Sequence, residues 1–211
     1  YEMRVENFVL VATAAVREAD DGSMFVREVK QKFGYSIRIL SGDEEARLGA
    51  LGIIGGAPQA QGIAGDLGGG SLDLISLEKG VFGKSDTLPL GHIRVGEDSN
   101  QDLSNAQHLV VENLNLLTWL GTSPRRSFYA IGGAWRAIAR LYIEHTKYPL
   151  HVLDNFTIGY DEALSFTNLI GGLSAQSLAK MGSISRQRSV SLPFAAIVLN
   201  NLIKVLLPKE I

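Results

Sequence analysis

The chain has 211 residues, of which 45% are hydrophobic and 20% charged, and its formal net charge is −2 at pH 7. This ordinary globular composition excludes a strongly basic protein that attracts nucleic acid through bulk charge. The absence of cysteine excludes disulfides and thiolate metal sites and is compatible with a cytoplasmic location. No uninterrupted apolar run approaches the roughly 18 residues of a membrane span, so we expect no stable membrane insertion.

The first quarter of the chain predicts alternating strands and helices. Residues 8–12 predict a buried strand, and apolar residues at helical spacing predict a helix over 24–33 with Gly34 as its C-cap. A short strand is predicted over 37–40. A second helix then starts with acids in its first turn and runs to 55–56. This order is typical of an α/β unit.

A domain boundary is predicted at residues 58–61, where a proline follows a pair of glycines. Beyond it we expect an antiparallel meander whose third strand covers 80–90, and a strand over 127–131. The predicted helices of this part cover 103–120, 134–145, 163–171, 174–181 and 193–207.

The segment GIAGDLGGGSLDLISL, residues 62–77, is the most informative stretch of the chain. The alternation after residue 71 predicts a strand, so the glycines Gly68, Gly69 and Gly70, with Ser71, fall in a tight strand-to-strand turn. Such a turn can direct several N–H groups at one phosphate. The neighbouring acids, Asp66 and Asp73, would repel phosphate unless a divalent cation lies between them. The alternative is a glycine-rich hairpin without a ligand.

Two further segments could face a phosphate. Glu44 and Glu45 open a helix and point in directions about 100° apart, so one of them can orient or deprotonate a water molecule. The alternative is that both serve the helix dipole. Arg17 follows a predicted strand and offers a planar fork of donors suited to phosphate, or it is a surface arginine at a turn.

The glycines Gly132 and Gly133 end a strand and open a helix, which allows anion binding by free N–H groups or simply close packing of strand and helix. Two basic clusters, 125–126 and 186–188, could contact a long polyanion, although a solvated face is the simpler interpretation. The four histidines show no metal-ligand spacing, and Trp135 is expected in the core.

Several motifs together resemble the exopolyphosphatase/guanosine pentaphosphate phosphohydrolase (Ppx/GppA) family in their order and spacing. They are ATAAVREA (12–19), ILSGDEEARLGALG (39–52), DLGGGSLDL (66–74), TLPLGHIRV (87–95) and YAIGGAWRAIARL (129–141). SGDEEARL followed about twenty residues later by DLGGGSLDL is far more specific than either motif alone.

The resemblance implies an α/β, RNase H-like fold of the actin-like ATPase type, with two domains and a phosphate-binding cleft between them. By position, Glu45 matches the general base and Arg17 a phosphate-binding arginine. Asp66 and Asp73 match acids that hold Mg²⁺, although the family usually has Glu where Asp73 stands. Gly68–Gly70 and Ser71 match the second phosphate loop, and Gly132 and Gly133 occupy the third glycine motif in an unusual Gly-Gly-Ala-Trp-Arg form.

The resemblance also predicts that the sequence is a fragment. The family's N-terminal Asp-x-Gly-Ser-Asn loop and its C-terminal Leu-Arg-Glu-Gly stretch have no counterpart in these residues. We therefore expect residues 1–57 to form the end of an incomplete first RNase H-like domain, which carries the catalytic Glu. Residues 58–211 are expected to form the second domain with the glycine-rich loop.

The function implied is that of a Mg²⁺-dependent hydrolase that releases orthophosphate from the end of inorganic polyphosphate. Two alternatives stay open: hydrolysis of the 5′-phosphate of guanosine pentaphosphate, and a module that senses nucleotide or polyphosphate without turnover. The expected partner is therefore inorganic polyphosphate or guanosine pentaphosphate, with no nucleic acid. A homodimer is compatible with the sequence.

Overall fold

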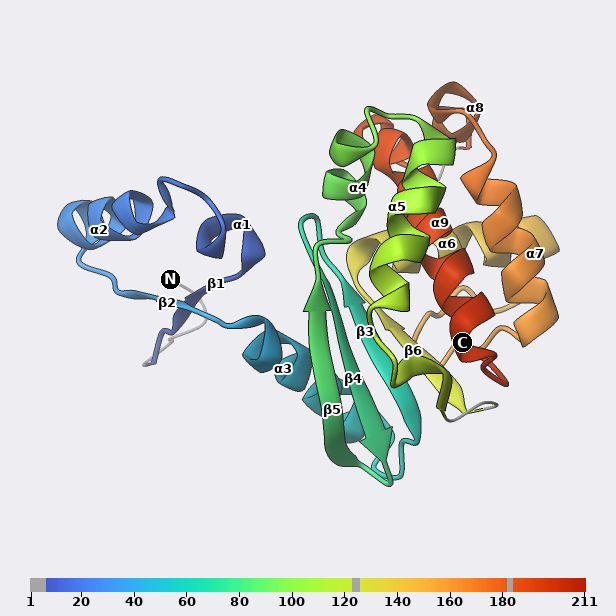
Figure 1. The fold of residues 1–211 in the computed structure, drawn as a ribbon, viewed down its shortest axis with the longest axis horizontal. Coiled ribbons are helices and arrows are strands. Elements are labelled where there is room, and N and C mark those ends of the chain that lie inside the picture. The colour runs from blue at the N-terminus through green and yellow to red at the C-terminus, as the bar shows by residue number, and fades with distance from the viewer. Residues whose placement is uncertain (1–6, 123–125, 182–183) are drawn as a thin grey trace.

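A computed structural model of the chain describes residues 7–122, 126–181 and 184–211. Its main body is a four-stranded mixed sheet with helices on both faces (Figure 1). The strands are β3 (Gly62–Leu67), β4 (Leu72–Glu78), β5 (Val81–Leu88) and β6 (Ser127–Ile131), in the order β5-β4-β3-β6. The first three form the predicted antiparallel meander, and β6 pairs in parallel with β3.

Helices of the second half cover one face of this sheet. They are α4 (His92–Asp98), α5 (Leu103–Asn115), α6 (Gly133–Thr146), α7 (Tyr160–Gly171), α8 (Ala175–Ala179) and α9 (Arg186–Leu206), with a short 3-10 turn at Leu120–Thr122. The central helix is α9, which packs against all the other five (Figure 1). It is long and apolar enough to cross a membrane, but 78% of its apolar window is buried here, as in the core helix of a globular protein.

The alternation predicted for β4 is confirmed and divides the hydrophobic core in two. Leu72 and Leu74 point into the large core under α9, and Ile75 and Leu77 point to the opposite face. On that opposite face lies α3 (Gly42–Gly56), which places Ala46 and Ala50 against the sheet. Small side chains let the helix approach closely, so the polar residues of its first turn lie over the end of the sheet.

A small N-terminal unit precedes α3 and extends away from the main body (Figure 1). It consists of β1 (Leu10–Ala12), α1 (Ala14–Arg17), α2 (Gly22–Phe33) and β2 (Ile37–Ile39), and its two strands pair in parallel. Gly34 ends α2 in the left-handed conformation with φ of 76°, as predicted. The boundary placed between residues 57 and 58 stays a prediction, and α3 itself packs on the second sheet.

Several predicted elements differ from those observed. The strand expected to be buried at 8–12 is short and largely solvent-accessible, with Phe8 64% and Val9 77% exposed, because only β2 lies beside it. The helix predicted over 103–120 ends at Asn115. The last helix begins at Arg186 instead of Pro193, because Ser185 caps it and a proline is tolerated inside this well-packed helix. Helix α4 was not predicted.

Candidate functional site

The glycine-rich turn joins β3 to β4 and is held by the start of α4. The carbonyl oxygens of Gly68 and Gly69 accept hydrogen bonds from the first three amides of α4, each at 3.1 Å. Within the described part of the chain, the N–H groups of Gly69 and Gly70 donate no hydrogen bond. The turn therefore presents unpaired backbone donors, as an anion-binding loop requires.

Gly91 makes this arrangement possible. A Cβ atom on Gly91 would lie 2.3 Å from backbone atoms of both Gly69 and Gly70, a distance that real Cβ atoms do not reach. The sequence Leu-Gly-His at the start of α4 therefore brings the helix backbone directly onto the turn. The turn is fixed by backbone packing and needs no long side chain to hold it.

Two carboxylates lie beside the turn, on the face of the sheet that α3 covers. Asp66 of β3 and Asp73 of β4 are direct cross-strand partners. Asp73 is 2% exposed and accepts hydrogen bonds on both oxygens, from Thr87 Oγ1 at 2.6 Å and from Ser71 Oγ at 3.1 Å. Asp66 accepts no hydrogen bond from the described residues, so its oxygens are free for a ligand.

The first turn of α3 adds a third carboxylate, and its two adjacent glutamates, Glu44 and Glu45, have different surroundings. Glu44 closes a capping box with Ser41: its Oε2 accepts from the Ser41 amide at 3.0 Å, and the Glu44 amide donates to Ser41 Oγ at 3.2 Å. Glu45 instead lies close enough to Asp66 and Asp73 to feel their charges. The dipole interpretation thus describes Glu44, whereas Glu45 faces the glycine-rich turn.

Arg17 connects the N-terminal unit to this group. Its Nη1 donates to the carbonyl oxygen of Leu40 at 2.8 Å and to Glu45 Oε2 at 3.3 Å. Its side chain is 22% exposed, so it is not the free surface arginine of the alternative interpretation. The geometry places one guanidinium against the carboxylate that could activate water.

Burial and mutual repulsion shift all three carboxylates in the same direction. Burial, followed by the Asp73 charge, raises the pKa of Glu45, and Arg17 partly opposes this. Burial and then the Asp73 charge also raise the pKa of Asp66, against a smaller effect of Arg136. Burial raises the pKa of Asp73 despite its two hydroxyl donors. Clustered acids with raised pKa values are typical of sites that bind a cation or move a proton.

The donor chemistry of these carboxylates suits Mg²⁺, which prefers hard oxygen ligands. Asp66 has unengaged oxygens, and Asp73 is held in a fixed orientation by Ser71 and Thr87. The described residues do not by themselves form a group of three side chains in metal-binding geometry. A cation held mainly by Asp66, with water and substrate oxygens as its other ligands, is consistent with this arrangement.

The third glycine motif packs closely beside β3 and lies near a cation, while its anion-binding role stays a prediction. Gly132 has φ of +114°, and a Cβ there would lie 2.6 Å from the carbonyl oxygen of Leu67, so this glycine permits close packing beside β3. Gly133 lies next to Arg188: the Arg188 Nη2 atom is 3.3 Å from the position of a Cβ on Gly133. The start of α6, which has no side-chain cap, therefore lies beside a cation.

Arg188 is exposed, as the solvated-face interpretation of residues 186–188 predicts, but its position beside Gly133 was not evident from the sequence. It also acts on His92, because its charge and, more strongly, burial lower the pKa of that imidazole. The Nδ1 atom of His92 is buried without a hydrogen-bond partner. Of the other basic cluster, Arg125 lies outside the described residues and Arg126 pairs with Glu78.

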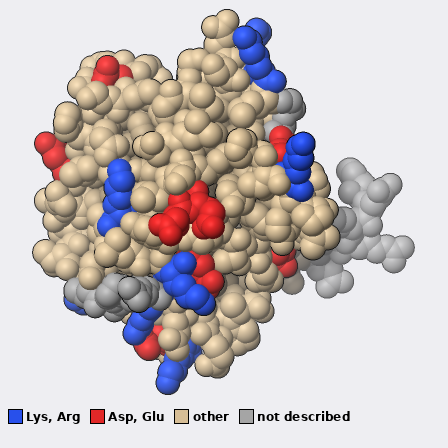
Figure 2. Space-filling model, turned by 90° about the vertical axis from the view of Figure 1, so that its right-hand side faces the viewer, with Lys and Arg blue, Asp and Glu red and all other residues tan. Residues whose placement is uncertain are grey.

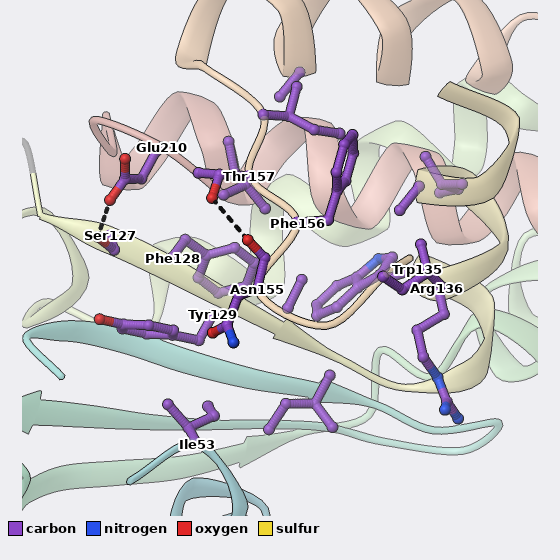
Figure 3. Close-up of a pocket in the computed structure, with 18 of the residues that line it drawn as sticks. Ile53, Ser127, Phe128, Tyr129, Trp135, Arg136, Asn155, Phe156, Thr157 and Glu210 are labelled. Atoms are coloured by element: carbon purple, nitrogen blue, oxygen red, sulfur yellow. Dashed lines mark hydrogen bonds between the residues drawn. The ribbon is translucent and has the colours of Figure 1, made fainter. Parts of the chain in front are cut away.

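A large cavity lies elsewhere in the described chain. It has a volume of about 770 Å³ and runs along the outer edge of β6. Figure 3 shows its lining of Phe128, Trp135 and Phe156, with the Arg136 side chain at one end. An apolar, aromatic lining does not suit a polyphosphate, so the candidate site is the glycine-rich turn with its carboxylates rather than this cavity.

Comparison with known proteins decides the family. A model of the Ppx/GppA phosphatase family matches residues 1–211. The chain belongs to the Ppx/GppA phosphatase family. The retrograde regulation protein 2 of Saccharomyces cerevisiae is 24% identical over an alignment of 209 positions, which covers 87% of this chain and 35% of the yeast protein.

Solved structures of Ppx/GppA proteins share the fold. The Aquifex aeolicus family member superposes with a TM-score of 0.79 at 19% identity, covering 100% of this chain and 70% of its own. An exopolyphosphatase from Cytophaga hutchinsonii gives 0.79 at 17% identity, covering 96% of this chain and 69% of its own. The predicted α/β fold with a mixed sheet, shared with Ppx/GppA proteins, is therefore confirmed. This chain spans about a third of the yeast relative that it matches.

Proposed function

We propose that this chain carries the hydrolytic half-site of an exopolyphosphatase, which releases orthophosphate from the end of inorganic polyphosphate. The observation that carries the proposal is the convergence of unpaired N–H groups at Gly69 and Gly70 with Glu45, Asp66 and Arg17. Membership of a phosphatase family supports the reaction class. The substrate itself is inferred from the chemistry of the site.

The distribution of lysine and arginine side chains bears on the class of substrate. The chain has a net charge of −2, and on the face shown in Figure 2 lysines and arginines stand singly or in small groups, not as a continuous basic surface. A polyanion must therefore be recognised locally. Backbone donors at the turn, Arg17 on one side and Arg188 beside Gly133 provide such local positive charge.

Each side chain then has a separate task. The turn holds a phosphoryl group through N–H donors that are fixed before the substrate arrives, which lowers the barrier because no reorganisation is needed. The raised pKa of Glu45 makes its carboxylate a better proton acceptor for the attacking water. Arg17 orients Glu45 and adds a cation against the charge that develops on the phosphoryl oxygens.

Mg²⁺ is part of the proposal. Asp66, with Asp73 in support, would hold it, and when bound it would neutralise phosphate charge next to two carboxylates. Without such a cation, Asp66, Asp73 and Glu45 would repel the substrate. The raised pKa values of all three acids support the presence of a cation in the working enzyme.

The test compares substrates on the full-length protein. Phosphate release is measured with inorganic polyphosphate, with guanosine pentaphosphate and with a simple phosphomonoester, each with and without Mg²⁺. The proposal predicts the highest kcat/KM on polyphosphate. Faster release from guanosine pentaphosphate would assign the nucleotide reaction instead. Tight polyphosphate binding without release on any substrate would favour a sensing module.

A further inference from the structure

Glu18 lies between two arginines from different parts of the molecule. Its Oε1 atom lies 3.6 Å from Arg17 Nη2, and its Oε2 atom accepts a hydrogen bond from Arg94 Nη2. Arg17 ends α1 of the N-terminal unit, whereas Arg94 belongs to α4 of the main body. The three side chains are only 22 to 34% exposed, so this bridge is partly shielded from solvent.

Arg94 is anchored directly to the glycine-rich turn. Its amide donates to the carbonyl oxygen of Gly69 at 3.1 Å. Its Nη2 atom lies 3.9 Å from where a Cβ on Gly70 would stand, and Ala14 Cβ of α1 lies 3.7 Å from the same point. The guanidinium therefore stands at the tip of the turn, next to the unpaired N–H groups of Gly69 and Gly70.

A purely structural ion pair does not account for this position. An exposed or half-exposed ion pair contributes little to stability, and Glu18 adds negative charge where the carboxylates already repel one another. Indeed, the Glu18 charge helps to raise the pKa of Asp73. A phosphate at the turn would replace Glu18 as the anion facing Arg94 and would relieve that repulsion.

We propose that Arg94 is a second phosphate-binding guanidinium of this site and that Glu18 occupies it until an anion arrives. The proposal rests on the proposed function and extends it, because it assigns the recognition of the phosphate chain to two arginines that flank Glu18, Arg17 and Arg94. Glu18 is then an internal competitor that lowers the affinity for weakly charged anions.

The test measures binding of inorganic tripolyphosphate by isothermal titration calorimetry. Arg94→Gln should weaken binding about tenfold or more, because a charge-assisted hydrogen-bonding pair is lost. Glu18→Gln should tighten binding about threefold, because the competing carboxylate and its repulsion are removed. Arg47→Gln is the matched control, since Arg47 is 52% exposed on α3 and pairs with Asp43.

The two variants are expected to change the affinity for tripolyphosphate in opposite directions, which distinguishes phosphate binding from a structural role. If the ion pair merely holds the two parts of the molecule together, both variants should weaken binding and lower the thermal midpoint. Weaker binding and a lower midpoint in both variants would overturn the inference. So would an unchanged affinity of Arg94→Gln, or a failure of the wild-type protein to bind tripolyphosphate. If affinities shift as expected but polyphosphate is not hydrolysed, the inference holds and only the proposed activity fails.

Discussion

Arg17 Nη1 lies 3.3 Å from Glu45 Oε2, so the end of α1 is joined to the first turn of α3 at the point where water would be activated. The same nitrogen donates to the carbonyl oxygen of Leu40 at 2.8 Å, which fixes the guanidinium. Burial and the charge of Asp73 raise the pKa of Glu45, and Arg17 limits this rise. The expected result is a base that is more basic than an ordinary glutamate.

Replacement of Arg17 should therefore change the pH dependence of the reaction. Arg17→Gln removes the cation that lowers the pKa of Glu45, so the acidic limb of the kcat profile should move to higher pH. The value of kcat/KM should also fall by about tenfold or more, because a charged hydrogen-bond donor is lost. A kcat profile with an unmoved acidic limb would show that Arg17 does not act through Glu45.

Asp66 should destabilise the protein at neutral pH. A carboxyl whose pKa is raised in the folded state binds more protons there than in the unfolded state, so stability falls as pH rises through the window between the two pKa values. Asp66→Asn should increase the free energy of unfolding at pH 7.5 by on the order of 1 kcal/mol. The gain should disappear at pH 3, where the wild-type carboxyl is protonated in both states.

Chemical denaturation at the two pH values measures this effect, with Asp20→Asn in an exposed loop as the control. A loss of stability in Asp66→Asn at pH 7.5 would mean that its carboxylate is satisfied within the fold. The variant should also lose polyphosphate hydrolysis. A variant that gains stability but loses activity is expected when the replaced carboxylate binds a ligand and does not stabilise the fold.

Mg²⁺ should stabilise the wild-type protein and not the Asp66→Asn variant. A ligand that binds only the folded state at 100 times its Kd adds about 2.7 kcal/mol to the free energy of unfolding. We expect a rise of the thermal midpoint with MgCl₂ over NaCl of equal ionic strength, measured by differential scanning calorimetry. Equal shifts in the two proteins would place any cation away from Asp66.

A larger residue at position 91 tests the close approach of α4 to the glycine-rich turn. Gly91→Ala puts a Cβ 2.3 Å from the backbone of Gly69 and Gly70, so the turn must move. We expect a loss of about 1–3 kcal/mol of stability, typical of overpacking, together with loss of anion binding.

The control is Gly52→Ala, since nothing lies within 4 Å of that Cβ and alanine is the better helix former. It should stabilise α3 by about 0.5–1 kcal/mol and leave binding unchanged. Urea denaturation and tripolyphosphate titration compare the two variants. A Gly91→Ala protein of wild-type affinity would contradict the role given to the α4 contact.

Local patterns were enough to predict the meander, the glycine-rich turn and the alternation of β4. The reason is that each depends on residues close together in sequence, such as Leu72 and Leu74 facing one core and Ile75 the other. The exposure of Phe8 was not predictable in this way, since burial of a strand depends on what lies beside it. The start of α9 was missed because packing tolerates Pro193 inside the helix.

The candidate site shows the same division. The motifs pointed to Glu45, Asp66 and the turn, and the family comparison supports the class of reaction. Contacts between separate segments were not evident in the sequence: Thr87 of β5 donates to Asp73 of the neighbouring β4, and Arg188 of α9 lies beside Gly133 of α6. Only the folded chain brings these partners together.

The central claim is that Glu45 acts as the base and its neighbour Glu44 only caps the helix. The decisive measurement is steady-state phosphate release from polyphosphate by full-length wild-type, Glu45→Gln and Glu44→Gln proteins. Glu45→Gln should lower kcat by about 10²–10⁴-fold, with a thermal midpoint at neutral pH at or above that of the wild-type protein, because a carboxylate with a raised pKa is removed. Glu44→Gln should keep the capping box, because the glutamine oxygen can accept from the Ser41 amide, and should leave kcat within about twofold. Undiminished turnover in Glu45→Gln would contradict the assignment.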